Sequence, residues 1–82
     1  MVYRTSGVCS TQIEFDIEEI DGRQCVRNVK FFGGCNGNLK GISQLVDGMP
    51  VRDVVSKLEG TTCGYKSTSC PDQLAKALRN YI

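Results

Sequence analysis

The sequence predicts an α+β domain in which an N-terminal antiparallel β-hairpin precedes three α-helices. Two patterns indicate this fold class. Hydrophobic and acidic residues alternate before an Asp21-Gly22 turn signal, as in a half-buried strand that enters a hairpin. Hydrophobic residues then recur at helical spacing in three later segments. Because the chain has only 82 residues, we expect residues 1–82 to form a single domain whose helices cover one face of the sheet.

Two strands form the predicted hairpin. In the first, Ile13, Phe15 and Ile17 point to one face of the sheet because a polar residue separates each from the next. The second strand covers residues 24–32. Residues 1–10, which show no such alternation, are expected to be irregular.

The register of the hairpin depends on the length of its turn. A two-residue turn would place Glu14 opposite Val29 and leave the hydrophobic faces unmatched. A three-residue loop with Gly22 in the left-handed region instead places Ile13 opposite Val29. We therefore predict the bulged three-residue loop.

Capping signals and hydrophobic stripes predict the three helices. The first is capped by Asn38, the second has Pro50 in its first turn, and the third is capped by Ser69. Gly48 and Gly60 end the first and second helices. The predicted stripes are Leu39, Ile42, Leu45 and Val46, then Val51, Val54, Val55 and Leu58, then Leu74, Ala77, Leu78 and Tyr81.

Composition excludes several classes of function. The chain has no histidine, so Ser-His and Cys-His nucleophile pairs and mixed Cys/His zinc sites are excluded. A net charge of +1 provides no field that would attract a nucleic acid. No apolar run approaches the roughly 20 residues of a membrane span. We expect a soluble cytoplasmic protein that binds neither nucleic acid nor a membrane.

Five cysteines are the strongest compositional signal. An odd number without a secretion signal does not suit a disulfide framework, so metal binding or redox chemistry is favoured. They are Cys9, Cys25, Cys35, Cys63 and Cys70.

The predicted topology brings four of these cysteines to one corner. The hairpin register sets Cys9 opposite Gly33 and hence near Cys35. The first two helices run away from this end and back, which returns Cys63 to it. Cys70 follows after six residues, at a helix N-terminus where backbone N–H groups favour negative charge.

Cys25 is excluded from the corner because a strand of ten residues separates it from Cys35. It is expected on the core face with Ile17 and Val29, as a small buried hydrophobic residue.

Three kinds of chemistry fit the four converging thiols. A closed tetrahedral zinc site is the simplest, since zinc accepts four thiolates and stabilises small domains. An iron-sulfur cluster fits the same ligands. Two disulfides, or a redox-active thiol-disulfide pair of Cys63 with Cys70, are the third. The C-x6-C spacing matches none of the standard paired metal signatures.

Other residues near this corner have simpler structural interpretations. Gly33, Gly34 and Gly37 could cradle a phosphate, but tight folding of the backbone around Cys35 is the better interpretation. Asp72 is predicted to be a capping-box partner rather than a base. Lys40 and Lys66 could help to bind an anionic ligand, but solvated surface groups are the better interpretation. Asn36 and Gln73 are expected to be exposed amides with no assigned role.

The run Thr68-Ser69-Cys70-Pro71-Asp72 resembles the motif of the TSCPD-domain family. Together with Gly33-Gly34-Cys35-Asn36-Gly37, it resembles the small stand-alone branch of that family that has four shared cysteines. The resemblance implies that Cys9, Cys35, Cys63 and Cys70 form the shared set, and that they are suspected metal ligands. Related domains are appended to the C-terminal end of adenosylcobalamin-dependent ribonucleotide reductases, so such members are often labelled reductase or nucleotide-binding by transfer. The predicted fold is more loosely similar to iron-sulfur cluster scaffold proteins.

These observations predict a small metal-binding module rather than an enzyme. We expect Cys9, Cys35, Cys63 and Cys70 to bind one metal ion, most simply zinc. A chain of 82 residues is too small for a reductase of its own. A ribonucleotide reductase or another metalloprotein is the partner that the resemblance implies. The alternatives are a dithiol redox or nucleotide-binding accessory of ribonucleotide reduction, and an iron-sulfur scaffold.

Overall fold

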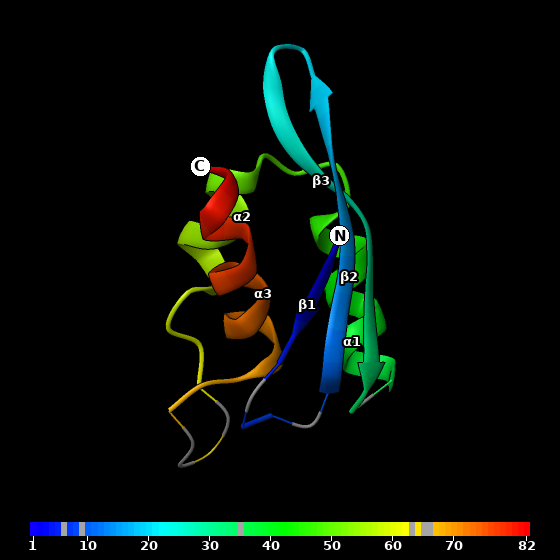
Figure 1. Ribbon diagram of the computed structural model, residues 1–82, viewed down its shortest axis with the longest axis vertical. Helices are drawn as coiled ribbons and strands as arrows, with labels where there is room; N and C mark the ends of the chain where they lie inside the picture. Colours follow the sequence, from blue (N-terminus) through cyan, green and yellow to red (C-terminus); the bar gives the residue numbers. More distant parts are fainter. Residues whose placement is uncertain (6, 9, 35, 63, 65–66) are drawn as a thin grey trace.

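The fold is α+β, with an N-terminal antiparallel sheet followed by three helices, as the sequence predicts (Figure 1). The computed structural model describes residues 1–5, 7–8, 10–34, 36–62, 64 and 67–82. The strands are β1 (Val2–Arg4), β2 (Ser10–Ile20) and β3 (Arg23–Gly33). The helices are α1 (Asn36–Val46), α2 (Val51–Leu58) and α3 (Cys70–Leu78), and a short 3-10 turn, Arg79–Tyr81, follows α3.

The sheet contains a strand that the sequence prediction misses. Residues 2–4 were expected to be irregular, yet they pair with β2, with Tyr3 opposite Ile13. The N-terminal ammonium of Met1 also donates to the carbonyl oxygen of Phe15 at 2.8 Å. A strand of three residues is too short to show alternation, which explains why the pattern did not reveal it.

The hairpin turn is the two-residue turn, so the predicted three-residue loop is wrong. Asp21 and Gly22 both have positive φ, 52° and 80°, and Ile20 lies directly opposite Arg23. Two positive φ values define the turn that matches the twist of paired strands.

A β-bulge inside β3 restores the match between the hydrophobic faces. Between two regularly paired stretches, Phe15 of β2 faces both Asn28 and Val29. Asn28 adopts a left-handed φ of 56° there. Ile13 consequently lies opposite Phe31 on one side of the bulge. The extra residue that the hydrophobic pattern demands is therefore placed in the strand and not in the turn.

The two-residue turn also changes the predicted environment of Cys25. Val26, and not Cys25, lies opposite Ile17, while Cys25 lies opposite Glu18. Cys25 is nevertheless buried, at 4% exposure, and its backbone bridges to Pro50. The expectation of a buried cysteine near the turn end is confirmed, and its place beside Ile17 and Val29 is wrong.

The helices largely follow their predicted stripes. α2 buries Val51, Val54 and Val55, and Pro50 is its N-cap residue. α1 starts two residues before the expected cap, and Leu45 is wrong as a core residue because it is 77% exposed. At about 100° per residue, Leu45 lies roughly 120° around the helix from the buried Leu39.

The core lies between the inner face of the sheet and the helices. α1 packs mainly on β3, and α2 packs on α3. The rings of Phe15 and Tyr81 meet edge to face, with centroids 5.8 Å apart. The buried cluster comprises Ile13, Phe15, Val26, Val29, Val46, Val51, Val54, Val55, Leu74, Ala77 and Leu78.

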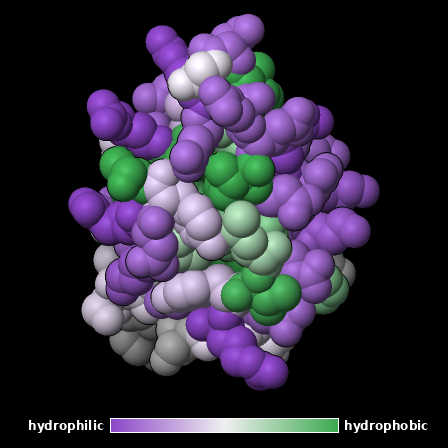
Figure 2. Space-filling view, turned by 45° about the horizontal axis from the view of Figure 1, so that its top comes forward, coloured by the Kyte–Doolittle hydropathy of each residue, from purple (hydrophilic) through white to green (hydrophobic). Residues whose placement is uncertain are grey.

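On the face of the molecule that Figure 2 shows, hydrophobic side chains lie as small patches among predominantly hydrophilic ones. Among the described residues, no helix is both long enough and apolar enough to span a membrane.

Candidate functional site

The start of α3 is fixed by the side chain of Ser69. Its Oγ accepts a hydrogen bond from the backbone N–H of Asp72 at 3.1 Å, which confirms the predicted N-cap. The same hydroxyl donates to the carbonyl oxygen of Thr61 at 2.7 Å. Ser69 therefore ties the N-terminus of α3 to the segment that follows α2.

Asp72 strengthens the same connection. Its Oδ1 accepts from the backbone N–H of Gly60 at 2.7 Å, and its Oδ2 accepts from the Thr68 hydroxyl. The Lys76 ammonium lies 3.3 Å from Oδ2. The carboxylate thus bonds to groups other than the Ser69 backbone N–H that a capping box would use, so that part of the prediction is wrong.

The charge of Asp72 suits this structural role. Burial raises the pKa of the Asp72 carboxyl, but hydrogen bonds from Thr68 and Gly60, together with the Lys76 ammonium, outweigh burial and hold that pKa below its usual value. The group is therefore ionised at neutral pH, which strengthens the hydrogen bonds that it accepts, and its lowered pKa makes it a weaker base than an ordinary carboxylate.

Gln73 belongs to this polar cluster and is not the exposed amide that was expected. Its side chain is 4% exposed, and its Nε2 donates to the hydroxyl oxygen of Thr68 at 3.0 Å. Thr68 therefore accepts from Gln73 while it donates to Asp72. The sequence does not reveal this role because an amide in the first turn of a helix has no signature of its own.

Cys70 lies at the first position of α3 and is 5% exposed. The buried hydroxyl of Ser10 donates to its sulfur, with an Oγ to Sγ distance of 3.0 Å. Ser10 is the first residue of β2 and lies opposite Gly33 at the end of β3. This contact joins β2 to α3, and the two residues lie 60 positions apart in the sequence.

The predicted set of metal ligands is only partly within the described residues. Cys70 is described, whereas Cys9, Cys35 and Cys63 lie outside the described residues. The register prediction for Cys9 is wrong in one respect, because Ser10 occupies the position opposite Gly33. Within the part of the chain that is described, no three Cys, Asp or Glu side chains are grouped as a metal site.

Cys25 lies far from this corner, as expected. Glu18, the partner of Cys25, lies eight positions along β2 from Ser10, which corresponds to roughly 26 Å of strand. The Cys25 thiol donates a hydrogen bond to the carbonyl oxygen of Arg23 at 3.7 Å.

The glycines at the end of β3 have the conformation that the tight-backbone interpretation requires. Gly33 and Gly34 have φ values of 81° and 80°, a region that side chains with a Cβ rarely adopt. The chain therefore turns sharply at this corner, immediately before Cys35.

A comparison with models of known protein families shows the family of this chain. The family model of the TSCPD domain matches residues 1–82. The chain belongs to the TSCPD-domain family. Neither the comparison with curated proteins nor the comparison with solved structures found a match.

The structure explains most of the TSCPD motif as the start of a helix. Thr68 and Asp72 bond to each other, Ser69 is the N-cap, and Pro71 lies in the first turn, where a missing N–H is tolerated. Cys70 is different, because its side chain contributes nothing to these contacts and instead presents a buried sulfur to Ser10. The motif thus holds one thiol at a rigid helix N-terminus.

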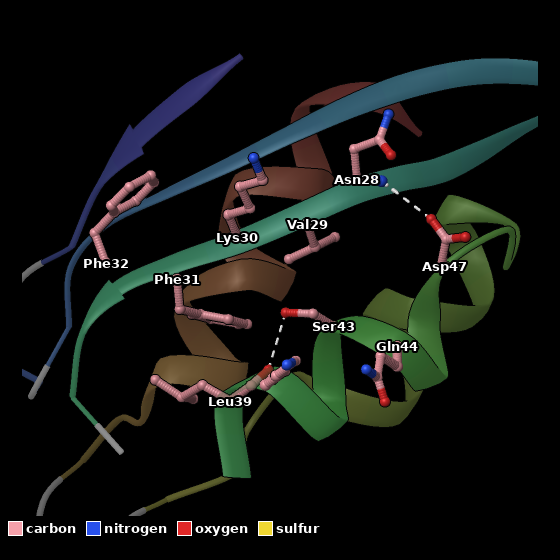
Figure 3. A pocket seen from close by; sticks show the side chains of 10 residues that line it. Asn28, Val29, Lys30, Phe31, Phe32, Leu39, Ser43, Gln44 and Asp47 are labelled. Atoms are coloured by element: carbon pink, nitrogen blue, oxygen red, sulfur yellow. Dashed lines mark hydrogen bonds between the residues drawn. The ribbon is translucent and has the colours of Figure 1, made fainter. Parts of the chain in front are cut away.

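A groove also lies between β3 and α1 of the TSCPD domain. It has a volume of about 620 Å³, and Val29 and Phe31 point into it toward Leu39 and Ser43 of α1 (Figure 3). Lys40, expected to be exposed, is exposed at its edge. A largely hydrophobic groove of this kind does not specify a ligand.

Proposed function

We propose that this TSCPD domain is a metal-binding module in which Cys9, Cys35, Cys63 and Cys70 hold one zinc ion. The observation that carries the proposal is the 3.0 Å contact between Ser10 Oγ and Cys70 Sγ. It links the residue that follows Cys9 in the sequence to the one predicted ligand that the structure describes.

Residues close in sequence to Cys35 and Cys63 lie near Ser10 and Cys70. Gly33, two residues before Cys35, lies opposite Ser10. Thr61, two residues before Cys63, accepts a hydrogen bond from Ser69, the neighbour of Cys70. Because adjacent Cα atoms are about 3.8 Å apart, two residues of chain reach at most about 7 Å. These contacts support a common site for the four thiols.

The donor set suits zinc. Thiolate sulfur is the usual ligand of structural zinc, and four thiolates complete a tetrahedral site without histidine, which the chain lacks. The buried sulfur of Cys70 and its hydroxyl donor resemble the outer-shell arrangement that orients metal ligands. When bound, zinc would join the end of β3, the loop after α2 and the start of α3, and its binding energy would add to the stability of the fold.

We further propose that the module acts as a single cytoplasmic domain without catalytic activity of its own. Membership of the TSCPD family supports an accessory role, for example beside a ribonucleotide reductase or another metalloprotein. A domain of 82 residues has room for a closed metal site but not for a radical cofactor together with a nucleotide site.

Metal content is the decisive measurement. Protein prepared without oxygen or chelator should contain one zinc per chain by elemental mass spectrometry, with Cys9, Cys35, Cys63 and Cys70 protected from iodoacetamide until a chelator is added. Iron with acid-labile sulfide would instead support the cluster scaffold. A metal-free protein with a Cys63–Cys70 disulfide would support the dithiol accessory.

Two variants separate metal binding from burial. Cys70→Ser should lose zinc, whereas Cys25→Ser should keep it, although both cysteines are buried to a similar extent. Metal-free wild-type protein whose thiols all react as readily as free cysteine would contradict the proposal.

A further inference from the structure

Ser10 is a buried hydroxyl whose hydrogen bond is made to sulfur. Its side chain is 3% exposed, and its Oγ lies 3.0 Å from Cys70 Sγ, a close approach for an acceptor as large as sulfur. Buried hydroxyls normally find oxygen acceptors, because an unsatisfied donor in the interior is costly. The sulfur of Cys70 is therefore the group that satisfies Ser10 within the described residues.

The position of Ser10 is fixed independently of this contact. Its backbone pairs with Gly33 at the start of β2, and its carbonyl oxygen accepts a hydrogen bond from the Thr5 hydroxyl. Cys70 is fixed from the other side by the helix start that Ser69 and Asp72 build. Two separately held residues thus meet at a defined distance, with the Ser10 hydroxyl 3.0 Å from the Cys70 sulfur.

We propose that Ser10 is a positioning residue for the metal site, which orients the Cys70 sulfur and stabilises its anionic, metal-bound form. This inference rests on the proposed function. An anionic, metal-bound sulfur accepts a stronger hydrogen bond than a neutral thiol does, so the contact is worth more with metal bound than without it. Hydrogen bonds to metal ligands from outside the coordination shell commonly change metal affinity by about 10- to 100-fold.

The absorption spectrum of bound cobalt(II) distinguishes the two roles of Ser10, because a purely structural role would leave that spectrum unchanged. Thiolate-to-cobalt charge-transfer absorption depends on how tightly the sulfur holds its electrons, and a hydroxyl donor to that sulfur raises the transition energy. The full chain is loaded with Co²⁺ as wild type and as Ser10→Ala, Ser10→Thr and Thr11→Ala. Thr11 is the matched control because its hydroxyl bonds to the carbonyl oxygen of Phe32 and is exposed.

Ser10→Ala should shift the charge-transfer band to longer wavelength and weaken Zn²⁺ affinity by about 10-fold in competition with a chromophoric chelator. Ser10→Thr, which keeps a hydroxyl, should have the band position and the Zn²⁺ affinity of wild type. Thr11→Ala should change neither quantity. Folding of each variant is checked by circular dichroism. If the added methyl prevents Ser10→Thr from folding, the comparison of Ser10→Ala with Thr11→Ala decides.

The possible failures are distinct. If wild-type protein binds neither Co²⁺ nor Zn²⁺, the proposed metal site is wrong, and the role of Ser10 is overturned with it. If wild-type protein binds both metals and folded Ser10→Ala has the wild-type spectrum and affinity, only the role of Ser10 is overturned.

Discussion

The carboxylate of Asp72, in the first turn of α3, accepts a hydrogen bond from the backbone N–H of Gly60, just after α2, at 2.7 Å. This hydrogen bond joins the two ends of the segment between α2 and α3, which contains Cys63 in the sequence. Because the carboxylate is 2% exposed and ionised, the bond is charge-assisted and shielded from water.

Replacing Asp72 should therefore destabilise the fold more than replacing an exposed acidic residue would. Asp72→Asn keeps the shape but removes the charge that Gly60, Thr68 and Lys76 contact. We expect the free energy of unfolding in urea to fall by about 2 kcal/mol. Asp53→Asn, at an exposed position in the first turn of α2, should change it by less than about 0.5 kcal/mol. Equal effects of the two substitutions would show that the bond to Gly60 contributes little.

The bulge at Asn28 leads to a second prediction, which tests the register of the sheet. Asn28 has a φ of 56°, a conformation that asparagine and glycine tolerate and β-branched residues resist. Asn28→Val should lower the free energy of unfolding by about 1 to 3 kcal/mol because of this strain. Asn28→Gly should cost clearly less, even though both variants lose the contact with Asp16. A Val variant as stable as the Gly variant would contradict the left-handed conformation.

This bulge also shows how far the sequence predicts the fold. The alternation of Ile13, Phe15 and Ile17 correctly requires an irregularity that brings both hydrophobic faces together, because a regular two-residue hairpin would not. The pattern does not say where the extra residue lies. An asparagine inside a strand is a weaker sequence signal than the Asp21-Gly22 turn, so the sequence favours an irregularity in the turn.

The candidate site was predictable only where a residue type has its own chemistry. Cysteine identifies itself, and Ser69 has a capping position before a helical stripe, so Cys70 and its helix start follow from the sequence. Ser10 and Gln73 have common side chains whose roles arise only from contacts across 60 and 5 residues. No local pattern encodes such contacts.

Lowering the pH should reveal how much the ionised Asp47 carboxylate contributes to the free energy of unfolding. The backbone N–H of Asn28 donates to its carboxylate at 3.0 Å, and with the Arg27 guanidinium it lowers the pKa of Asp47 below its ordinary value of 3.8. A lowered folded-state pKa gives stability that is present above about pH 4 and is lost as the pH falls through the folded-state value. The free energy of unfolding should therefore drop more between pH 5 and pH 2 for wild type than for Asp47→Asn. Parallel curves for the two proteins would show that the Asn28 contact does not favour the ionised form.

Cys70 and Cys25 offer a matched comparison for the metal proposal, since their exposures are 5% and 4%. Without metal, replacing either by serine removes one buried sulfur, and the two losses of unfolding free energy should be similar, about 1 kcal/mol each. With one equivalent of zinc, Cys25→Ser should keep the stabilisation that the metal gives, because its sulfur lies at the turn end of the hairpin. Cys70→Ser should lose most of it, because the free energy of metal binding is then part of the free energy of folding. Urea unfolding of both variants with zinc and with chelator measures the four values. If zinc stabilises both variants equally, Cys70 is not a ligand, and its contact with Ser10 serves packing alone.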